Sequence, residues 1–313
     1  MSPAAPGRPR TTERREIRDL ALVTNPAAGH GRAVRAAERA EARLRERGLA
    51  VRVLTGADPA DTLRLIREAV ARGVDALAVV GGDGIVHLAL QALAGSGVPL
   101  GIVPGGTGND HAREYGLPLG DPEAAADVIA DGHVTTADLG LAETADGTSR
   151  YFGTVLAAGF DSLVTDRANR LPWPRGRMRY NLAILAEFAE LRPLAFRLVL
   201  ADGTTLERPL TLAAVGNTRY YGGGMAICPA ADRADGQLDV TLVDAMPRLR
   251  VARFFPTVFK GTHVQHPGVT THRTPSLRLE SPGITAYADG EYLGPLPAEV
   301  RVLPDELRVI VPR

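Results

Sequence analysis

Three glycine-rich turns each follow a short apolar run of the sequence. They are Asn-Pro-Ala-Ala-Gly at 25–29, Gly-Gly-Asp-Gly at 81–84 and Pro-Gly-Gly-Thr-Gly-Asn-Asp at 104–110. Glycine lets the backbone approach a ligand closely, and the free N–H groups at the start of a following helix attract phosphate. One such turn would equally suit an ordinary loop, but three of them favour a phosphate-binding crevice.

Asp83 lies between glycines in the second turn. A carboxylate there would repel phosphate unless a divalent cation bridged the two, and Mg²⁺ favours one or two carboxylates together with phosphate oxygens. Asp83 is therefore a candidate ligand for a nucleotide-bound Mg²⁺. An aspartate at this place is also a common helix N-cap, and the two roles are compatible.

A late Ala-Asp-Gly-Glu segment at 288–291 holds two further acids. In extended backbone, the side chains of Asp289 and Glu291 would share one face. A single carboxylate can orient the nucleophile in phosphoryl transfer. Taken alone, however, Asp-Gly is more simply an exposed hairpin turn.

The glycine-rich turns need a sheet that brings them together. Short apolar runs in the first 140 residues predict strands over 19–24, 51–54, 76–80 and 100–103. Helical patterns alternate with them over 33–47, 59–72, 85–93 and 122–130. This alternation implies right-handed crossovers and a parallel, Rossmann-like α/β sheet, whose carboxyl edge would carry all three turns.

The pattern changes near Thr135, where segments become shorter and Asp-Gly turn dipeptides recur. We therefore expect a mostly antiparallel β domain, with one helix over about 178–190. The predicted organisation is a disordered tail at 1–16, a nucleotide-binding domain at 17–137, a β-rich lipid or substrate domain at 138–299, and a last segment at 300–313 that returns to the first domain.

Composition excludes several classes of protein. The 313 residues carry 36 basic and 36 acidic side chains, so no global field attracts nucleic acid. Lys260 is the only lysine, which rules out the lysine of a Walker-type loop and that of protein kinases. The lone Cys228 excludes an internal disulfide. No run reaches the roughly 18 apolar residues of a membrane span, and the first residues lack the apolar core of a secretory signal.

The motifs together resemble the diacylglycerol kinase catalytic family, which includes bacterial lipid kinases and, more distantly, sphingosine and ceramide kinases. The resemblance rests on the three turns in order, on Pro-Ala-Ala-Asp-Arg-Ala-Asp-Gly-Gln-Leu-Asp at 229–239 and on the segment at 288–291, and it spans about residues 19–311. It implies an NAD-kinase-like first domain and an ATP site at the cleft between the domains.

The resemblance also assigns roles to residues. Glu291 would be the general base toward the lipid hydroxyl, with Asp289 and Asp83 supporting catalysis. The nucleotide would be lined by Asn25, Gly29, Thr55, Gly81, Gly82, Asp83, Gly84, Gly106, Thr107 and Asn109.

The segment at 229–239 resembles the family's magnesium-binding turn. Asp232, Asp235 and Gln237 would occupy its three ligand positions, through side-chain or backbone oxygens. The alternative is an ordinary Asp-Gly turn that binds no metal. The chain also departs from the family by carrying Ile85 where threonine is frequent and His87 where asparagine is common, and we interpret His87 as a packing or capping residue.

A membrane-facing segment is expected between Arg167 and Tyr180, where five arginines surround Trp173. Arginine beside tryptophan suits the lipid headgroup region, although a solvated basic loop with Trp173 packed inward is the slightly favoured alternative. The expected location is cytoplasmic, peripheral at the inner membrane face.

The leading prediction is thus an ATP- and Mg²⁺-dependent lipid kinase, with diacylglycerol as the first candidate acceptor. Sphingoid or ceramide-type acceptors stay open because acceptor choice depends on pocket shape. NAD kinase is the nearest enzymatic rival. A catalytically silent lipid- or nucleotide-binding protein is the rival of another class.

Overall fold

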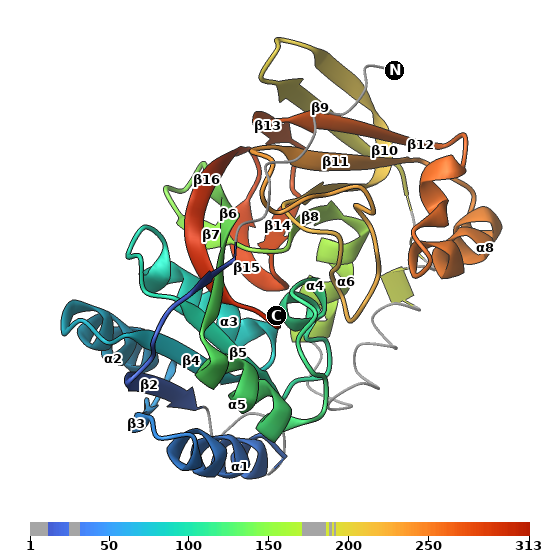
Figure 1. The fold of residues 1–313 in the computed structure, drawn as a ribbon. Helices are drawn as coiled ribbons and strands as arrows, with labels where there is room; N and C mark the ends of the chain where they lie inside the picture. Colours follow the sequence, from blue (N-terminus) through green and yellow to red (C-terminus); the bar gives the residue numbers. More distant parts are fainter. Residues whose placement is uncertain (1–11, 25–31, 171–185, 188–189, 191) are drawn as a thin grey trace.

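The computed structural model describes residues 12–24, 32–170, 186–187, 190 and 192–313. Its strands join into one sheet with a parallel part and an antiparallel part (Figure 1). The predicted fold class, an α/β parallel domain followed by a mostly antiparallel β domain, is confirmed.

The parallel part has the strand order β3-β2-β4-β5. These strands are β2 (Asp19–Thr24), β3 (Ala50–Thr55), β4 (Ala76–Gly81) and β5 (Leu100–Pro104). Every residue of β4 and β5 is buried, because helices cover both faces of the sheet. The continuous apolar runs of the sequence therefore predicted these two strands well.

Helices pair on each face of this sheet (Figure 1). α1 (Arg32–Glu46) and α5 (Pro122–Asp131) lie on one face, and α2 (Pro59–Ala71) and α3 (Asp83–Leu93) on the other. Side chains alternate along β2, so that Leu22 packs under the first pair and Val23 under the second. Both α2 and α5 begin with an aspartate N-cap followed by proline, which fixes where each helix starts.

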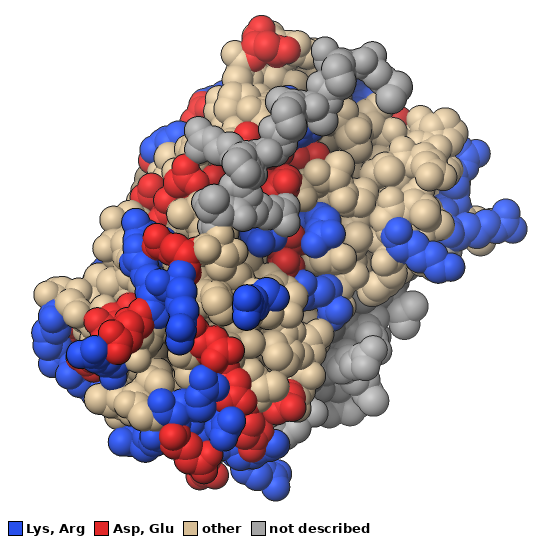
Figure 2. All heavy atoms as spheres, viewed as in Figure 1, with Lys and Arg blue, Asp and Glu red and all other residues tan. Residues whose placement is uncertain are grey.

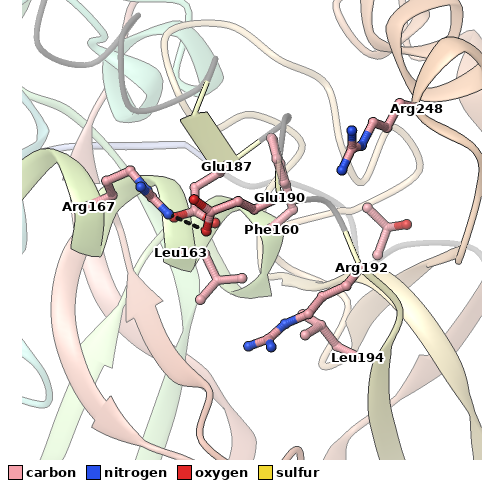
Figure 3. A pocket seen from close by; sticks show the side chains of 9 residues that line it. Phe160, Leu163, Arg167, Glu187, Glu190, Arg192, Leu194 and Arg248 are labelled. Carbon is pink, nitrogen blue, oxygen red and sulfur yellow. Dashed lines mark hydrogen bonds and ion pairs between the residues drawn. The ribbon is translucent and has the colours of Figure 1, made fainter.

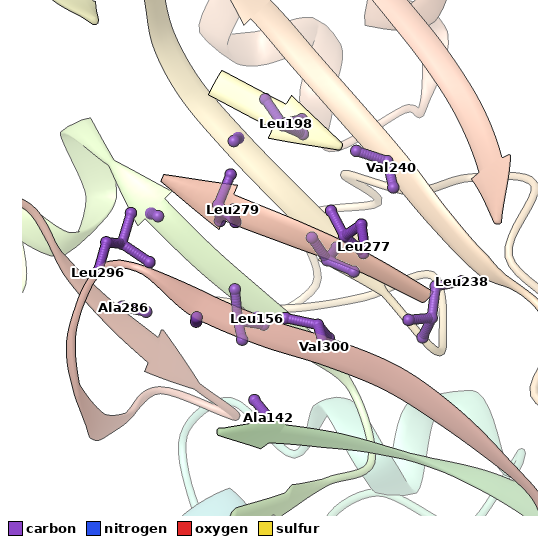
Figure 4. Packing of buried hydrophobic residues seen from close by; sticks show 14 of the residues in the cluster. Ala142, Leu156, Leu198, Leu238, Val240, Leu277, Leu279, Ala286, Leu296 and Val300 are labelled. Atoms are coloured by element: carbon purple, nitrogen blue, oxygen red, sulfur yellow. The ribbon is translucent and has the colours of Figure 1, made fainter. Parts of the chain in front are cut away.

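The second half is antiparallel apart from its link to β5. Its strands are β6 (His133–Thr144), β7 (Ser149–Phe152), β8 (Val155–Gly159), β9 (Leu194–Leu200), β10 (Thr205–Gly216), β11 (Leu238–Asp244), β12 (Val269–Thr274), β13 (Ser276–Glu280), β14 (Thr285–Ala288), β15 (Glu291–Pro295) and β16 (Ala298–Ile310). The helices of this half are α6 (Phe160–Arg170), α8 (Arg248–Val258) and the 3₁₀ turn η1 (Thr262–Gln265), whereas the short α4 (Asp110–Glu114) follows β5 in the first half. A buried cluster that includes Leu156, Leu198, Leu277 and Val300 forms its core (Figure 4).

β16 connects the two parts of the sheet. It pairs antiparallel with β6 and β13 and meets β5 in parallel at Val309, opposite Leu100. Its register against β6 shifts between Leu303 and Leu307, where Asp305 has a φ of 55°. The end of the chain therefore lies against the parallel strands.

The prediction that residues 1–16 form a disordered tail is wrong for the last of these residues. β1 (Glu13–Arg14) pairs with β6, and the Arg15 amide donates to the Gly132 carbonyl at 2.8 Å. Backbone hydrogen bonds thus fix a stretch whose charged side chains suggested solvent. The helix predicted over 178–190 lies mostly outside the described residues.

Candidate active site

Two of the glycine-rich turns pack directly on one another. β4 ends at Gly81 and β5 at Pro104, so both turns lie at the carboxyl edge of the parallel sheet. The Gly105 amide donates to the Gly81 carbonyl at 2.8 Å. A Cβ added to Gly106 would lie 2.4 Å from the Cα of Gly82, so a side chain there would collide with backbone. Glycine at this position is required for the two turns to approach.

Asn109 shapes the second of these turns from within. It has a left-handed φ of 55°, its Oδ1 accepts from the Gly106 amide at 3.0 Å, and its Nδ2 donates to the Gly106 carbonyl at 2.9 Å. Asparagine tolerates this backbone region better than most residues. The bonds close the loop on itself and leave Thr107 exposed at its tip.

The first strands contribute a polar group at the same edge. The hydroxyls of Thr24 and Thr55, at the ends of β2 and β3, are 2.9 Å apart. Asn25 and Gly29, predicted to line the nucleotide, lie outside the described residues.

Asp83 occupies the first turn of α3 and is bonded to α4. Its Oδ1 accepts from the His111 amide and faces His111 Nδ1, each at 3.2 Å. Burial raises the pKa of Asp83, but the hydrogen bonds from His111 outweigh burial and lower that pKa below its usual range. Asp83 is therefore an ionised carboxylate with a fixed orientation.

Asp110 lies next to Asp83 although it was not predicted as a site residue. A Cβ on Gly108 would lie 2.7 Å from Asp83 Oδ2 and 3.6 Å from Asp110 Oδ2, which places both carboxylates around that glycine. Asp110 accepts from the Gly223 amide at 2.8 Å. Burial and then the nearby charge of Asp83 raise the pKa of Asp110.

Asp289 is the most heavily bonded carboxylate of the site. It accepts from the Gly153 amide at 3.1 Å, the Thr154 amide at 2.7 Å and the Thr154 hydroxyl at 2.6 Å. His87 Nδ1, on α3, is 3.0 Å away. His111 Nε2 follows at 3.8 Å.

These contacts determine the charge of the cluster. Burial opposes ionisation of Asp289, but His111, His87 and the Thr154 hydroxyl lower its pKa. Burial also opposes the charged form of His111 and so acts to lower its pKa. The carboxylates of Asp289 and Asp83 outweigh burial and raise that pKa. His111 thus lies between two carboxylates and links the end of the second domain to α3 and α4.

Glu291 lies one glycine away in the chain but in a different environment. Ala288 pairs with Glu291 across the β14–β15 hairpin, and Asp289 and Gly290 form its two-residue turn with φ of 53° and 81°. Positive φ at both central residues is the geometry that favours Asp-Gly. The expectation that Asp289 and Glu291 share one face of extended backbone is therefore wrong.

The hairpin turn nevertheless delivers both acids to α3. A Cβ on Gly84 would lie 2.7 Å from Glu291 Oε1, so the exposed Glu291 carboxylate stands at the N-terminal turn of α3. The buried Asp289 meets His87 one turn further along the same helix. The predicted pair is thus brought to the second glycine-rich turn.

Sequence reasoning missed the side chains that hold this arrangement. His87 was interpreted as packing or capping, and it does pack, but its partner is Asp289. Asp110 is the last residue of the third motif and His111 follows it directly. Their position at the end of that motif was the available signal. Thr154 carried no signal, because its role depends on contact with a residue 135 positions away.

The predicted magnesium turn is a pair of consecutive Asx turns. Asp232 accepts from the Ala234 amide at 3.2 Å, and Asp235 from the Gln237 amide at 3.0 Å. Asp235 also forms an ion pair with Arg273. Within the described residues, no three His, Cys, Asp or Glu side chains are grouped so that they could hold a metal ion.

A pocket of about 550 Å³ lies in the second half of the molecule and is lined by none of the predicted site residues (Figure 3). Its lining includes Phe160, Leu163, Arg167, Arg192, Leu194 and Arg248. Arg167 is paired with Glu187 and, at 2.7 Å, with Glu190. Arg167 is also the first residue of the predicted membrane segment, whose residues 171–180, including Trp173, lie outside the described residues.

Comparison with known proteins gives matches along nearly the whole chain. Residues 19–142 match the model of the diacylglycerol kinase catalytic domain. Residues 154–311 match that of the YegS C-terminal NAD kinase beta sandwich-like domain.

Curated relatives are similar over most of their length. A protein of Mycobacterium tuberculosis named diacylglycerol kinase is 53% identical over 300 residues, covering 96% of this chain and 97% of its own. A Pseudomonas aeruginosa protein named "Probable lipid kinase YegS-like" is 35% identical, with 89% of each chain covered.

Solved structures share the fold. A diacylglycerol kinase from Bacillus anthracis has a TM-score of 0.72 at 21% identity, covering 95% of this chain and 98% of its own. An NAD kinase from Archaeoglobus fulgidus in complex with ATP has a TM-score of 0.52 at 15% identity, covering 93% of each chain. At these identities the likeness concerns the fold alone, and it agrees with the NAD-kinase-like fold expected from the sequence.

Proposed function

Because the chain belongs to the diacylglycerol kinase family and is a lipid kinase, we propose that it transfers the γ-phosphate of ATP to the free hydroxyl of diacylglycerol. The products are phosphatidic acid and ADP. The observation that carries this proposal is the position of Glu291, an exposed carboxylate beside Gly84 at the start of α3.

The glycine-rich edge suits the nucleotide. Gly82 caps α3 without any side-chain hydrogen bond, so the first N–H groups of this eleven-residue helix are open to an anion. The proposed nucleotide site comprises Asn25, Gly29, Thr55, Gly81, Gly82, Asp83, Gly84, Gly106, Thr107 and Asn109. Asn109 would act through the shape of its loop, since its side chain is bonded to Gly106.

Glu291 would act as the general base. As the acceptor oxygen attacks the γ-phosphorus, its proton passes to the Glu291 carboxylate, and the bond from the γ-phosphorus to the leaving oxygen of ADP breaks. Asp289 would keep the hairpin turn, and with it Glu291, at a fixed place beside α3. Asp289 is therefore a positioning residue in this scheme.

Asp83 is the proposed protein ligand for a Mg²⁺ ion carried by the nucleotide. Its ionised, oriented carboxylate provides the hard oxygen that this cation prefers. When bound, the ion would neutralise charge on the phosphates.

The residues Asp232, Asp235 and Gln237 do not by themselves form a metal cage, since Asp235 is paired with Arg273 and the required group of ligand side chains is absent from the described residues. No step of the reaction is assigned to a metal at that turn. A structural Mg²⁺ there stays a prediction that would rely on backbone carbonyls.

The acceptor is proposed to use the pocket in the second half. Phe160, Leu163 and Leu194 provide apolar surface for acyl chains, and arginine and glutamate side chains also line the pocket (Figure 3). Sphingoid bases and ceramide present a hydroxyl on similar chains and are the alternative acceptors. NAD has no acyl chains that could occupy this surface. The NAD kinase from Archaeoglobus fulgidus is similar to this chain in fold alone.

The test is phosphate transfer from labelled ATP to diacylglycerol, ceramide, sphingosine and NAD, each offered separately with Mg²⁺, the lipids in mixed micelles. Labelled phosphatidic acid as the main product is the expected result. Preferred labelling of a sphingolipid would change the acceptor, and labelled NADP would replace the lipid assignment. Absence of any labelled product would favour the silent binding protein.

A further inference from the structure

α8 is packed into the protein along only one side. Val251, Phe254 and Val258 are buried and belong to an apolar cluster with residues of β10 and the loop after it. Their spacing of three, four and seven residues defines the inward face of the helix. The remainder of its circumference faces outward.

The outward side carries a concentration of exposed apolar groups. Leu249 is 79% exposed, Phe255 39% and Phe259 50%. They are three of the seven exposed large hydrophobic residues in the described part of the chain. The rings of Phe255 and Phe259 are 5.9 Å apart, edge to face, so they form one apolar surface rather than scattered contacts.

Cations surround this apolar surface. Arg248, Arg250, Arg253 and Lys260 lie on or next to α8, and none of them forms an ion pair with another described residue. The sequence holds no acid between Asp244 and Glu280, although acids and bases are equal in number over the whole chain. Figure 2 shows basic side chains projecting beside an uncharged surface at the right-hand edge, where Figure 1 places α8.

We propose that α8 docks the enzyme onto the surface of an anionic phospholipid bilayer. Exposed phenylalanine and leucine would enter the boundary between headgroups and acyl chains, while arginine and lysine would meet lipid phosphates. The proposal rests on the lipid kinase function, because an enzyme whose acceptor is held in a bilayer has to meet the surface of that bilayer.

The acceptor pocket adjoins the same helix. Arg248, the first residue of α8, also lines the pocket and extends toward it from the helix (Figure 3). Docking through α8 therefore places the rim of the pocket at the bilayer. A lipid acceptor then enters it without crossing water.

The charges favour a bilayer over a second copy of the chain. Two copies meeting through α8 would bring at least eight cations together without an acid from the helix to offset them. An anionic lipid surface offers the complementary charge and accepts apolar side chains at the same depth.

The test measures binding to vesicles of mixed phosphatidylglycerol and phosphatidylcholine by co-sedimentation. The variant is Leu249→Ser/Phe259→Ser/Arg253→Glu, which leaves the pocket residue Arg248 in place. Its matched control is Leu119→Ser/Val53→Ser/Arg67→Glu, which changes exposed residues of the first half to the same types. We expect the α8 variant to bind at least tenfold more weakly, while the control binds like the wild type.

Further measurements distinguish failure of docking from failure of the proposed function. Phosphorylation of a short-chain diacylglycerol dispersed below its aggregation threshold should be unchanged in the α8 variant, and thermal unfolding should confirm that it is folded. Wild-type binding should also fall on vesicles of phosphatidylcholine alone and at high salt.

Unchanged vesicle binding by the α8 variant would overturn the docking proposal, whatever the kinase assays show. The same holds if the variant converts a wild-type dimer into a monomer without affecting vesicle binding, since α8 would then be a contact between copies. If the wild type phosphorylates none of the lipids, the kinase proposal fails, while loss of binding by the variant would still establish the membrane face.

Discussion

The glycine-rich edge and the β14–β15 hairpin meet at α3, but they are built in different ways. The edge consists of backbone, with Gly106 against Gly82 and the Gly105 amide on the Gly81 carbonyl. The hairpin is held by side chains, because Asp289 bonds to His87 and Thr154 from distant parts of the chain. The first arrangement excludes side chains to make room for a ligand, whereas the second uses them to hold one carboxylate in place.

The comparison predicts that Asp289→Asn has the largest combined effect. It removes the charge that the Gly153 and Thr154 donors and the two histidines stabilise, and breaking a buried, paired charge costs about 3–5 kcal/mol. Denaturant unfolding should show this loss of stability, and lipid phosphorylation should fall with it. Unchanged stability would mean that the hairpin is anchored by other contacts.

Gly106→Ala and Gly84→Ala should separate the two regions. At Gly106 a Cβ meets the backbone of Gly82 at 2.4 Å, so the turns must move apart and ATP should bind on the order of tenfold more weakly. Isothermal titration with ATP measures this loss directly.

At Gly84 the added Cβ meets only the flexible end of Glu291, at 2.7 Å. Displacing that carboxylate should lower kcat about tenfold. Alanine favours the helix by about 1 kcal/mol over glycine, so stability should be retained or increased. Equal behaviour of the two alanine variants in titration and kinetics would contradict the distinction between backbone and side-chain regions.

The smallest expected effect concerns pH. The pKa of His111 is raised in the folded state by Asp289 and Asp83, so its stabilising contribution is complete below the unfolded-state pKa and is lost as pH rises through the folded-state pKa. His111→Gln should therefore destabilise the protein more at pH 6 than at pH 9. Unfolding free energies at the two pH values provide the measurement, and an equal loss at both would contradict a charged His111.

The sequence was informative where structure is local. Apolar runs over 76–80 and 100–103 predicted two buried strands, and the glycines after them predicted the edge at which those strands end. The Asp-Gly dipeptide predicted the hairpin turn, although we treated its neighbours as extended when pairing Asp289 with Glu291.

Long-range contacts could not be predicted in this way. His87 and Asp289 are 202 residues apart, and nothing in either local pattern indicates their hydrogen bond. The ion pair between Asp235 and Arg273 could not be predicted for the same reason, since Arg273 lies in β12, outside the predicted magnesium turn. The family resemblance supplied the roles of Glu291 and Asp83, but the side chains that orient them emerged from the three-dimensional contacts.

The assignment of Glu291 as the general base is tested by comparing Glu291→Gln with the wild type in labelled-phosphate transfer to diacylglycerol. Glu299→Gln, which removes another exposed carboxylate of the second half, is the matched control. We predict a fall in kcat of about 10²–10⁴-fold for Glu291→Gln, with unchanged thermal stability and ATP affinity, and wild-type activity for the control. Retention of wild-type kcat by Glu291→Gln would contradict the assignment of Glu291 as the base.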